Sequence, residues 1–113
     1  MNELPERGAL VWFDFTPQLG HEQEGHRPAL VMSPRLYHER SKLALVCPIT
    51  SNMRPWPWKV MLPDGLAVAG AVLVDQVRAI DRAARRLRHV GQAPEAVVSE
   101  VQAKLAALLG MTG

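Results

Sequence analysis

The sequence has little that could stabilise a fold covalently or through a metal. Its single cysteine, Cys47, excludes an internal disulfide, and its four scattered histidines do not have the spacing of a zinc site. No apolar run is long enough to span a membrane, and residues 1–6 have neither the basic nor the apolar region of a signal peptide. We therefore expect a soluble cytoplasmic protein with no membrane segment, no cofactor and no metal.

The sequence also lacks a strong bias in composition. Hydrophobic residues make up 48% and charged residues 21% of its 113 residues, which is ordinary for a globular protein. That length can bury one core but not two, so we expect a single domain over residues 1–113. The net charge of +2 says little about nucleic acid. Five arginines lie close together, however, and form either a phosphate-binding stripe or a solvated face: Arg78, Arg82, Arg85, Arg86 and Arg88.

Local patterns predict a series of short strands followed by a helix. Prolines, glycines and polar residues separate the apolar and β-branched stretches. The expected strands are 9–15, 28–32, 43–49, 58–62, 71–77 continuing through 80, and a short pairing at 87–90, with one helical turn at 36–39 and a turn at 63–65. We expect Pro28 to open its strand, because a missing N–H is tolerated at a first position. The segment 43–49 is almost entirely apolar and should be buried on both faces.

The C-terminal segment has the pattern of an amphipathic helix. Pro94 suits the first helical position and Gly110 the end. Apolar residues recur between them at helical spacing: Val97, Val98, Val101, Leu105, Leu108 and Leu109. Short strands with one terminal helix predict a mainly β fold with α, built as a small, strongly bent antiparallel sheet or barrel.

Two polar segments next to predicted strands could form an active site. Residues 22–28 precede the second strand, and Thr50 to Asn52 follow the third. If both open at the same end of the sheet, a phosphodiester between them would meet a cation, hydroxyl groups and a carboxylate. This set suffices for metal-free RNA cleavage, in which a base deprotonates the 2′-hydroxyl and a cation stabilises the phosphorane. The products would be a 2′,3′-cyclic phosphate and a 5′-hydroxyl.

Arg27 is the first catalytic candidate, because a guanidinium can hold two phosphate oxygens in parallel. Thr50 would donate its hydroxyl to the same phosphate, with Ser51 and Asn52 as weaker candidates. Glu22 is the most plausible base, and His26 or His21 are alternatives by pKa. Taken singly, an arginine at a strand start or a threonine at a turn is as easily structural as catalytic.

Neighbouring residues have more limited roles. His26 and Arg27 must point to opposite sides if both are extended, so we expect His26 to pack or to hydrogen-bond. Asp14 should order the loop that follows it, and Cys47 should be a buried hydrophobic residue. Trp56 is a candidate for stacking an unpaired base between the cations Arg54 and Lys59, whereas Trp58 is expected in the core.

Three blocks in order give the chain a family resemblance. They are Gly8-x-x-Val11-Trp12-x-Asp14-x-x-Pro17 through Glu22-Gln23-x-Gly25-His26-Arg27-Pro28, then Pro48-Ile49-Thr50-Ser51, then Asp75-Gln76-Val77-Arg78 with Ile80-Asp81. Together they resemble toxin endoribonucleases of the MazF/PemK type. The resemblance implies an SH3-like barrel with a C-terminal helix, a homodimer, metal-independent cleavage of single-stranded RNA at short sequences, and neutralisation by an acidic MazE-like antitoxin.

By this resemblance Arg27 and Thr50 match the catalytic arginine and threonine of the family, and Glu22 matches an acidic residue of the site. Glu24 and His21 depart from the usual pattern. The segment 56–58 lies where such toxins vary most, so the resemblance implies a chemistry but no target sequence. The candidate RNA-binding residues are Gln23, His26, Ser51, Asn52, Arg54, Trp56, Lys59, Gln76 and Arg78.

Two other functions fit parts of the sequence. A non-catalytic SH3-like toxin of the gyrase-poison type would use the same loops to bind a protein. A basic RNA or DNA chaperone would rest on the stripe from Arg78 to His89 alone, and would bind with strong salt dependence without cutting the strand.

Overall fold

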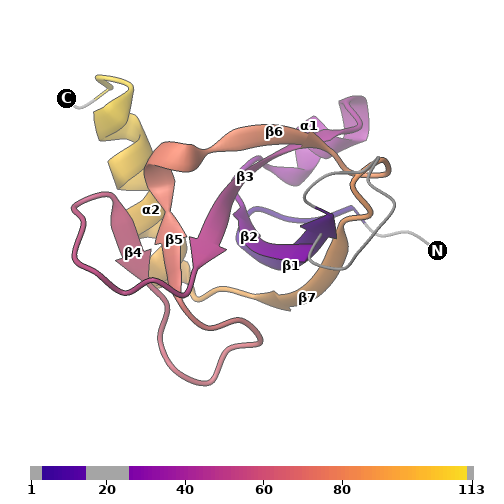
Figure 1. Cartoon of the computed structure of the whole chain (residues 1–113). Helices are drawn as coiled ribbons and strands as arrows, with labels where there is room; N and C mark the ends of the chain where they lie inside the picture. The colour runs from indigo at the N-terminus through magenta and orange to yellow at the C-terminus, as the bar shows by residue number, and fades with distance from the viewer. Residues whose placement is uncertain (1–3, 15–25, 112–113) are drawn as a thin grey trace.

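The computed structural model describes residues 4–14 and 26–111, which form a bent antiparallel sheet and a C-terminal helix (Figure 1). Six of the strands are β1 (Ala9–Asp14), β2 (His26–Val31), β3 (Leu43–Thr50), β4 (Lys59–Met61), β5 (Ala71–Leu73) and β6 (Arg78–Asp81). The remaining elements are β7 (Arg88–Gln92), the helices α1 (Arg35–Arg40) and α2 (Glu95–Leu108), and the 3-10 helix η2 (Val74–Gln76). The predicted helical turn, the pairing near 87–90 and the turn at Asp64–Gly65 are confirmed.

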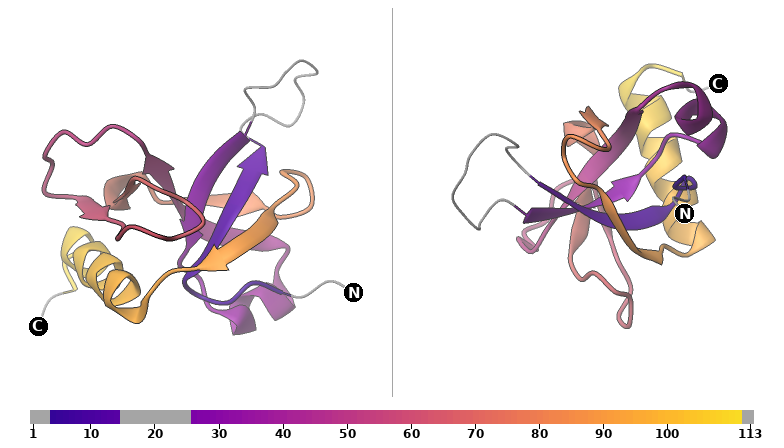
Figure 2. Two further views of the ribbon diagram at one scale, coloured as in Figure 1. Left: turned by 90° about the horizontal axis from the view of Figure 1, so that it is seen from below. Right: turned by 90° about the vertical axis from the view of Figure 1, so that its right-hand side faces the viewer.

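The strands follow one another across the sheet in the order β4-β5-β3-β2-β1-β7, and β6 pairs with β3 beside this path. Within the described residues no pairing joins β4 to β7, so the sheet is strongly bent but not closed. Figure 2 shows how β3 runs through the middle of the molecule, while α2 lies against β4 and η2. The predicted mainly β fold with a terminal helix is confirmed.

Two apolar clusters fill the two faces of the central strands, because successive side chains of a strand point to opposite faces. One cluster joins the sheet to α2 and includes Leu10, Leu30, Cys47, Ile49, Val97 and Val101. The other includes Val11, Phe13, Ala29, Val31, Val46 and Ile80. Cys47 is fully buried as predicted, and this burial, helped by the negative charge of Asp75, raises the pKa of its thiol to about 12.

β2 begins earlier than predicted. It starts at His26, so Pro28 lies inside the strand instead of opening it. Pro28 faces Trp12 of β1, and pairing with β3 begins only at the next residue, Ala29. Pro28 therefore sits where β2 has a neighbour on one side only, and there a missing N–H is tolerated.

β3 is not buried on both faces along its whole length. Leu45 is 40% exposed and lies opposite Ala79 of β6, which is also exposed. The outer face of β3 is uncovered here because the helix α2 packs farther along the sheet. Trp58 was expected in the core, but it is only partly buried and precedes β4.

The segment 71–80 does form a fifth and a sixth strand, but the expectation that the two are continuous is wrong, because η2 divides β5 from β6. β5 pairs with the end of β3, Val72 opposite Ile49, whereas β6 pairs with its first half, Arg78 opposite Val46. If the register of β5 continued along β3, Val46 would face Asp75, which lies three residues before Arg78 in the chain. The three-residue turn of η2 takes up this difference.

α2 begins one residue later than predicted, with Pro94 as its N-cap. Val97 and Val101 are buried, but Leu108 and Leu109 are 40% and 71% exposed, so the last turn extends beyond the sheet. Gly110, at a φ of 73°, ends the helix as expected, because a left-handed residue there is most easily a glycine. None of the helices in the described ranges is long and apolar enough to cross a membrane.

Candidate active site

A pocket of about 260 Å³ opens where five elements meet at one end of the second apolar cluster. It is lined by Phe13 of β1, Arg27 of β2, Pro48 of β3, Gln76 of η2 and Arg78 of β6. Two of these five residues are arginines and a third is an amide donor. A small pocket with two guanidinium groups at its wall is suited to an anion such as a phosphate.

Strand register explains why these side chains face the same way. Arg27 lies opposite Phe13, and two residues farther along β2 is Ala29, which belongs to the buried cluster. Arg78 lies opposite Val46, a residue of the same cluster. Since residues opposite each other in an antiparallel pair share a face, both arginines continue the apolar face to its open end.

Thr50 lies at the same end of the sheet. The register of β2 on β3 pairs Ala29 with Pro48, and two residues farther toward this end of the sheet are Arg27 on β2 and Thr50 on β3. This register directs the Thr50 side chain to the side on which Arg27 lies. The Thr50 hydroxyl oxygen accepts a hydrogen bond from the backbone N–H of Asn52 at 3.0 Å. The hydroxyl can still donate its own hydrogen to a phosphate oxygen.

The loop from Ser51 to Trp58 is stabilised by hydrogen bonds among its own residues and with Lys59, which follows it. The Lys59 ammonium donates to the backbone carbonyl oxygens of Asn52, at 2.6 Å, and Arg54, at 2.8 Å. The side-chain oxygen of Asn52 accepts from the backbone N–H of Arg54 at 2.9 Å. Lys59 and Asn52, both candidates for RNA binding, thus also stabilise this loop.

Trp56 is attached to the rim of the pocket. Its indole N–H donates to a carboxylate oxygen of Asp75 at 3.2 Å, and Asp75 precedes Gln76 in η2. The side chain is nevertheless 50% exposed, so part of the ring remains open to solvent. The sequence indicated Trp56 as a candidate but not its carboxylate partner, since no sequence signal showed that the 3-10 turn would bring Asp75 to it.

His26 and Arg27 point to opposite sides of β2, as the alternation of a strand requires. His26 pairs with Asp14 across the sheet, and its Nδ1 lies 3.3 Å from a carboxylate oxygen of Asp14 and 3.3 Å from Arg88 Nη2. The Asp14 contact has the distance of an ion pair but not the alignment of a hydrogen bond. Arg86 adds a cation, 3.4 Å from the other oxygen of Asp14.

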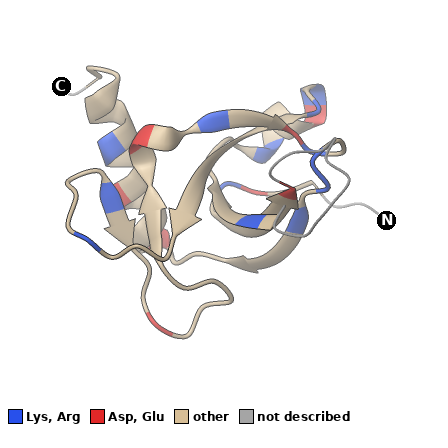
Figure 3. Cartoon of the chain, in the orientation of Figure 1, with Lys and Arg blue, Asp and Glu red and all other residues tan. Residues whose placement is uncertain are grey.

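The basic stripe is not one continuous surface. Arg82 donates to the carbonyl oxygens of His38 and Ser41, and Arg85 donates to that of Asp14, so both are partly buried structural residues. Arg78 belongs to the pocket, while Arg86 and Arg88 are exposed beside β1 and β2. Figure 3 shows the Lys and Arg positions spread over several elements, with a group at the turn between β6 and β7.

The structure brings together Arg27, Gln76 and Arg78, and places Thr50 and Trp56 around them. Glu22 and Gln23, like the alternative base His21, lie in residues 15–25, outside the described part of the chain. Sequence reasoning missed Phe13 and Pro48 as walls of the pocket. Phe13 could have been identified from the pairing of the first two strands, which places it opposite Arg27. Among residues 4–14 and 26–111 no three His, Cys, Asp or Glu side chains gather as metal ligands would.

Comparison with known proteins assigns the family of this small β protein. The family model described as "PemK-like, MazF-like toxin of type II toxin-antitoxin system" matches residues 6–109, and the chain belongs to that family. The endoribonuclease toxin MazF of Escherichia coli K12 is 36% identical over 107 residues, 95% of this chain and 96% of the relative. The endoribonuclease toxin ChpB of the same organism is 40% identical over 110 residues, 92% of this chain and 93% of the relative.

Solved structures agree with this assignment. MazF from Deinococcus radiodurans superposes with a TM-score of 0.86 at 47% identity, over 97% of this chain and 100% of that one. A MazE-MazF complex from the same organism gives a TM-score of 0.88 at 44% identity, with the same coverage of 97% and 100%. The curated relatives cited above are named endoribonucleases, so the gyrase-poison alternative finds no support here.

Proposed function

We propose that this protein is a sequence-specific, metal-independent endoribonuclease toxin that cleaves single-stranded RNA. The 2′-hydroxyl would attack the adjacent phosphorus and leave a 2′,3′-cyclic phosphate and a 5′-hydroxyl. The observation that carries the proposal is the pocket in which Arg27 and Arg78 converge beside Thr50. Family membership and the names of the curated relatives support it independently. We propose that the toxin domain comprises residues 1–113 and acts in the cytoplasm, by inhibiting translation and growth.

Arg27 would bind the non-bridging oxygens of the scissile phosphate, and its attraction would grow as negative charge develops on the phosphorane. Thr50 would donate its hydroxyl hydrogen to the same group. Arg78 would add a second cation, and Gln76 could donate its amide to a phosphate or a base edge. DNA lacks the internal 2′-hydroxyl nucleophile, so the same site would not cleave it by this route.

Glu22 remains our proposed general base. Of the two alternatives, His26 points to the face opposite Arg27 and already lies against Asp14 and Arg88, which disfavours it as the base, whereas His21 remains an alternative to Glu22. We propose that the substrate strand is also bound by Gln23, His26, Ser51, Asn52, Arg54, Trp56, Lys59, Gln76 and Arg78. In this set Trp56 would stack a base, since its ring is half exposed and its N–H is held by Asp75.

The protein would act as a homodimer neutralised by an acidic, MazE-like antitoxin. A MazE-MazF complex is among the matched structures, and an acidic segment laid over the pocket would compete with RNA for the same arginines. A synthetic peptide of the cognate antitoxin should therefore compete with single-stranded RNA for binding.

The decisive experiment incubates the purified protein with a mixed RNA pool in EDTA and sequences the 5′-hydroxyl ends that form. Arg27→Ala should lower the cleavage rate by about 100- to 1,000-fold, the usual effect of removing one transition-state donor. Thr50→Val should lower it in the same direction with nearly unchanged side-chain size. Arg35→Ala is the matched control, because Arg35 is 50% exposed on α1 and pairs only with surface carboxylates in the described residues. Unchanged cleavage by Arg27→Ala, with folding intact, would refute the assignment.

A further inference from the structure

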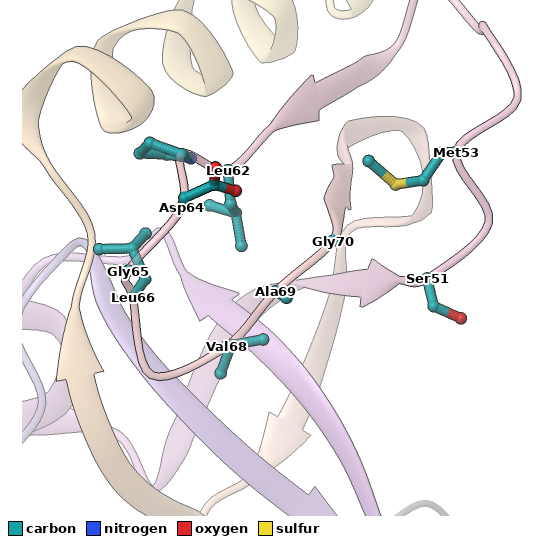
Figure 4. Close-up of a pocket in the computed structure, with 10 residues that line it drawn as sticks. Ser51, Met53, Leu62, Asp64, Gly65, Leu66, Val68, Ala69 and Gly70 are labelled. Atoms are coloured by element: carbon teal, nitrogen blue, oxygen red, sulfur yellow. The ribbon is translucent and has the colours of Figure 1, made fainter.

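A second pocket, of about 320 Å³, lies between the segment that follows β3 and the segment that joins β4 to β5 (Figure 4). Ser51 and Met53 stand on one side, Asp64 to Leu66 on the other, and Val68 to Gly70 cross between them. Leu62 and Val68 are buried and belong to the first apolar cluster. The size is at the lower end of the range of about 300–1,000 Å³ typical of small-molecule sites, which fits one planar ring system.

This pocket lies next to Thr50, a residue of the candidate active site. Ser51, which lines it, directly follows Thr50. Gly70, which also lines it, packs so closely on Thr50 that a Cβ atom there would overlap the Thr50 carbonyl oxygen. A nucleotide chain held at Thr50 therefore needs only a short step to place one of its bases between the two segments.

The walls of the pocket have the chemistry of a nucleobase site. Met53 is 48% exposed and offers a polarisable thioether to a ring face, and Leu66 is partly buried against the apolar cluster. Asp64 is the one charged residue among the ten that line the pocket. A carboxylate accepts hydrogen bonds from the exocyclic amino group of cytosine, and it equally suits those of adenine or guanine, whereas uracil has none.

We propose that this pocket binds a base of the substrate RNA close to the cleaved linkage, and that Asp64 selects an amino-bearing base over uracil. The inference rests on the proposed function in that it takes single-stranded RNA as the ligand. The carboxylate favours a base over a side chain of the antitoxin, since an acidic peptide would be repelled by Asp64. The exposed Arg54, from the same loop as Met53, supplies a cation for the backbone of the bound strand.

The test measures base selection by binding, so that it does not depend on cleavage. A random pool of short 2′-O-methyl RNA, which has no nucleophilic 2′-hydroxyl, is bound to the intact protein and the retained fraction is sequenced. The native protein should enrich an amino-bearing base at one position. Asp64→Asn should reduce that enrichment by about tenfold, within the range expected for one base-reading group, and leave the other positions unchanged.

Two further variants sharpen the result. Glu100→Gln makes the same chemical change on the exposed surface of α2 and should leave the enrichment intact. Ala69→Trp fills the pocket from an exposed lining position and should abolish the enrichment at the same position. Identical base enrichment in the native protein and Asp64→Asn would overturn the proposal. So would an effect of these variants on antitoxin binding alone.

Cleavage of an unmodified RNA pool, measured in parallel, separates this inference from the proposed function. If the native protein releases no 5′-hydroxyl ends, the nuclease assignment fails, while the binding experiment still decides whether Asp64 reads a base.

Discussion

Two glycines of the segment between β4 and β5 give a matched pair of substitutions with different expected effects. Gly70 has a φ of 130° and Gly65 a φ of 92°, and both conformations are strained for a residue with a Cβ atom. At Gly65 nothing lies within 4 Å of the position of an added Cβ. At Gly70 that atom would overlap the Thr50 carbonyl oxygen and would lie 3.2 Å from Ile49 Cγ2. Only Gly70→Ala therefore adds a steric clash to the backbone strain.

The expected sizes follow from these contacts. Backbone strain alone should lower the free energy of unfolding by about 1–3 kcal/mol in each variant. The overlap at Gly70 should cost about 1–3 kcal/mol more, as overpacking of a core does. The Gly70 carbonyl also accepts the backbone N–H of Leu62 at 3.0 Å, so relaxation there would disturb the end of β4. Urea unfolding at equal protein concentration measures both values.

Activity gives a second readout. If Gly70→Ala relaxes by moving Thr50, the hydroxyl is displaced from the phosphate, and a displacement of about 1 Å can lower the rate about 100-fold. We expect kcat to fall much more in Gly70→Ala than in Gly65→Ala; both residues line the second pocket, so kcat, and not RNA affinity, is the quantity compared. Equal destabilisation and equal kcat of the two variants would refute the reasoning, because an added Cβ meets neighbouring atoms only at Gly70.

Three further results are expected. His38 is buried between the Ser33 hydroxyl, 2.7 Å from Nε2, and the Pro5 carbonyl oxygen, 2.8 Å from Nδ1. Burial and the charge of Arg82 lower the pKa of His38, although the Pro5 hydrogen bond and Glu6 act in the opposite direction. The contribution of neutral His38 to stability is therefore full above about pH 6.5 and is lost as the pH falls toward the lowered pKa. Urea midpoints should therefore drop on acidification in the native protein, and less in His38→Gln; parallel curves would contradict this. Because the pKa of its thiol is raised to about 12, Cys47 should not react with iodoacetamide at pH 8 until urea unfolds the chain. Mass spectrometry measures the labelling, and a labelled native protein would disprove this prediction. Asp75→Ala should free the Trp56 indole and weaken RNA binding by several-fold, as titration of Trp fluorescence would show, whereas an unaltered Kd would remove Asp75 from the binding surface.

The sequence predicted the elements better than the way they pair. Alternation and turn residues located β1, α1, β7 and α2 to within about two residues, because these signals are local. The break at η2 was not located in this way, since the polar pair Asp75 and Gln76 lies between valines on both sides and only the register with β3 requires the turn. Leu45 was expected to be buried because it is apolar, but the residues that the structure describes leave 40% of it exposed.

For the site, the local pattern indicated Arg27 and Thr50 at strand ends, and the register agrees with their lying on one side. It could not indicate that Phe13, Pro48 and Arg78 would close around them, because these contacts join segments far apart in the chain. The bonds of Lys59 to two loop carbonyls were also unpredictable, since they depend on the path of the loop.

The three-residue turn of η2 fixes which side chain reaches the anion pocket. On β5, the side chains that share the Thr50 side have odd numbers, such as Ala71, whereas on β6 they have even numbers, such as Arg78. The registers of β5 and β6 on β3 differ by three residues, and this odd difference causes the change of parity. Deleting or adding one residue between 74 and 77 would turn Val77 inward and Arg78 outward, so a change in length, with every candidate catalytic residue retained, would remove one of the two cations from the pocket.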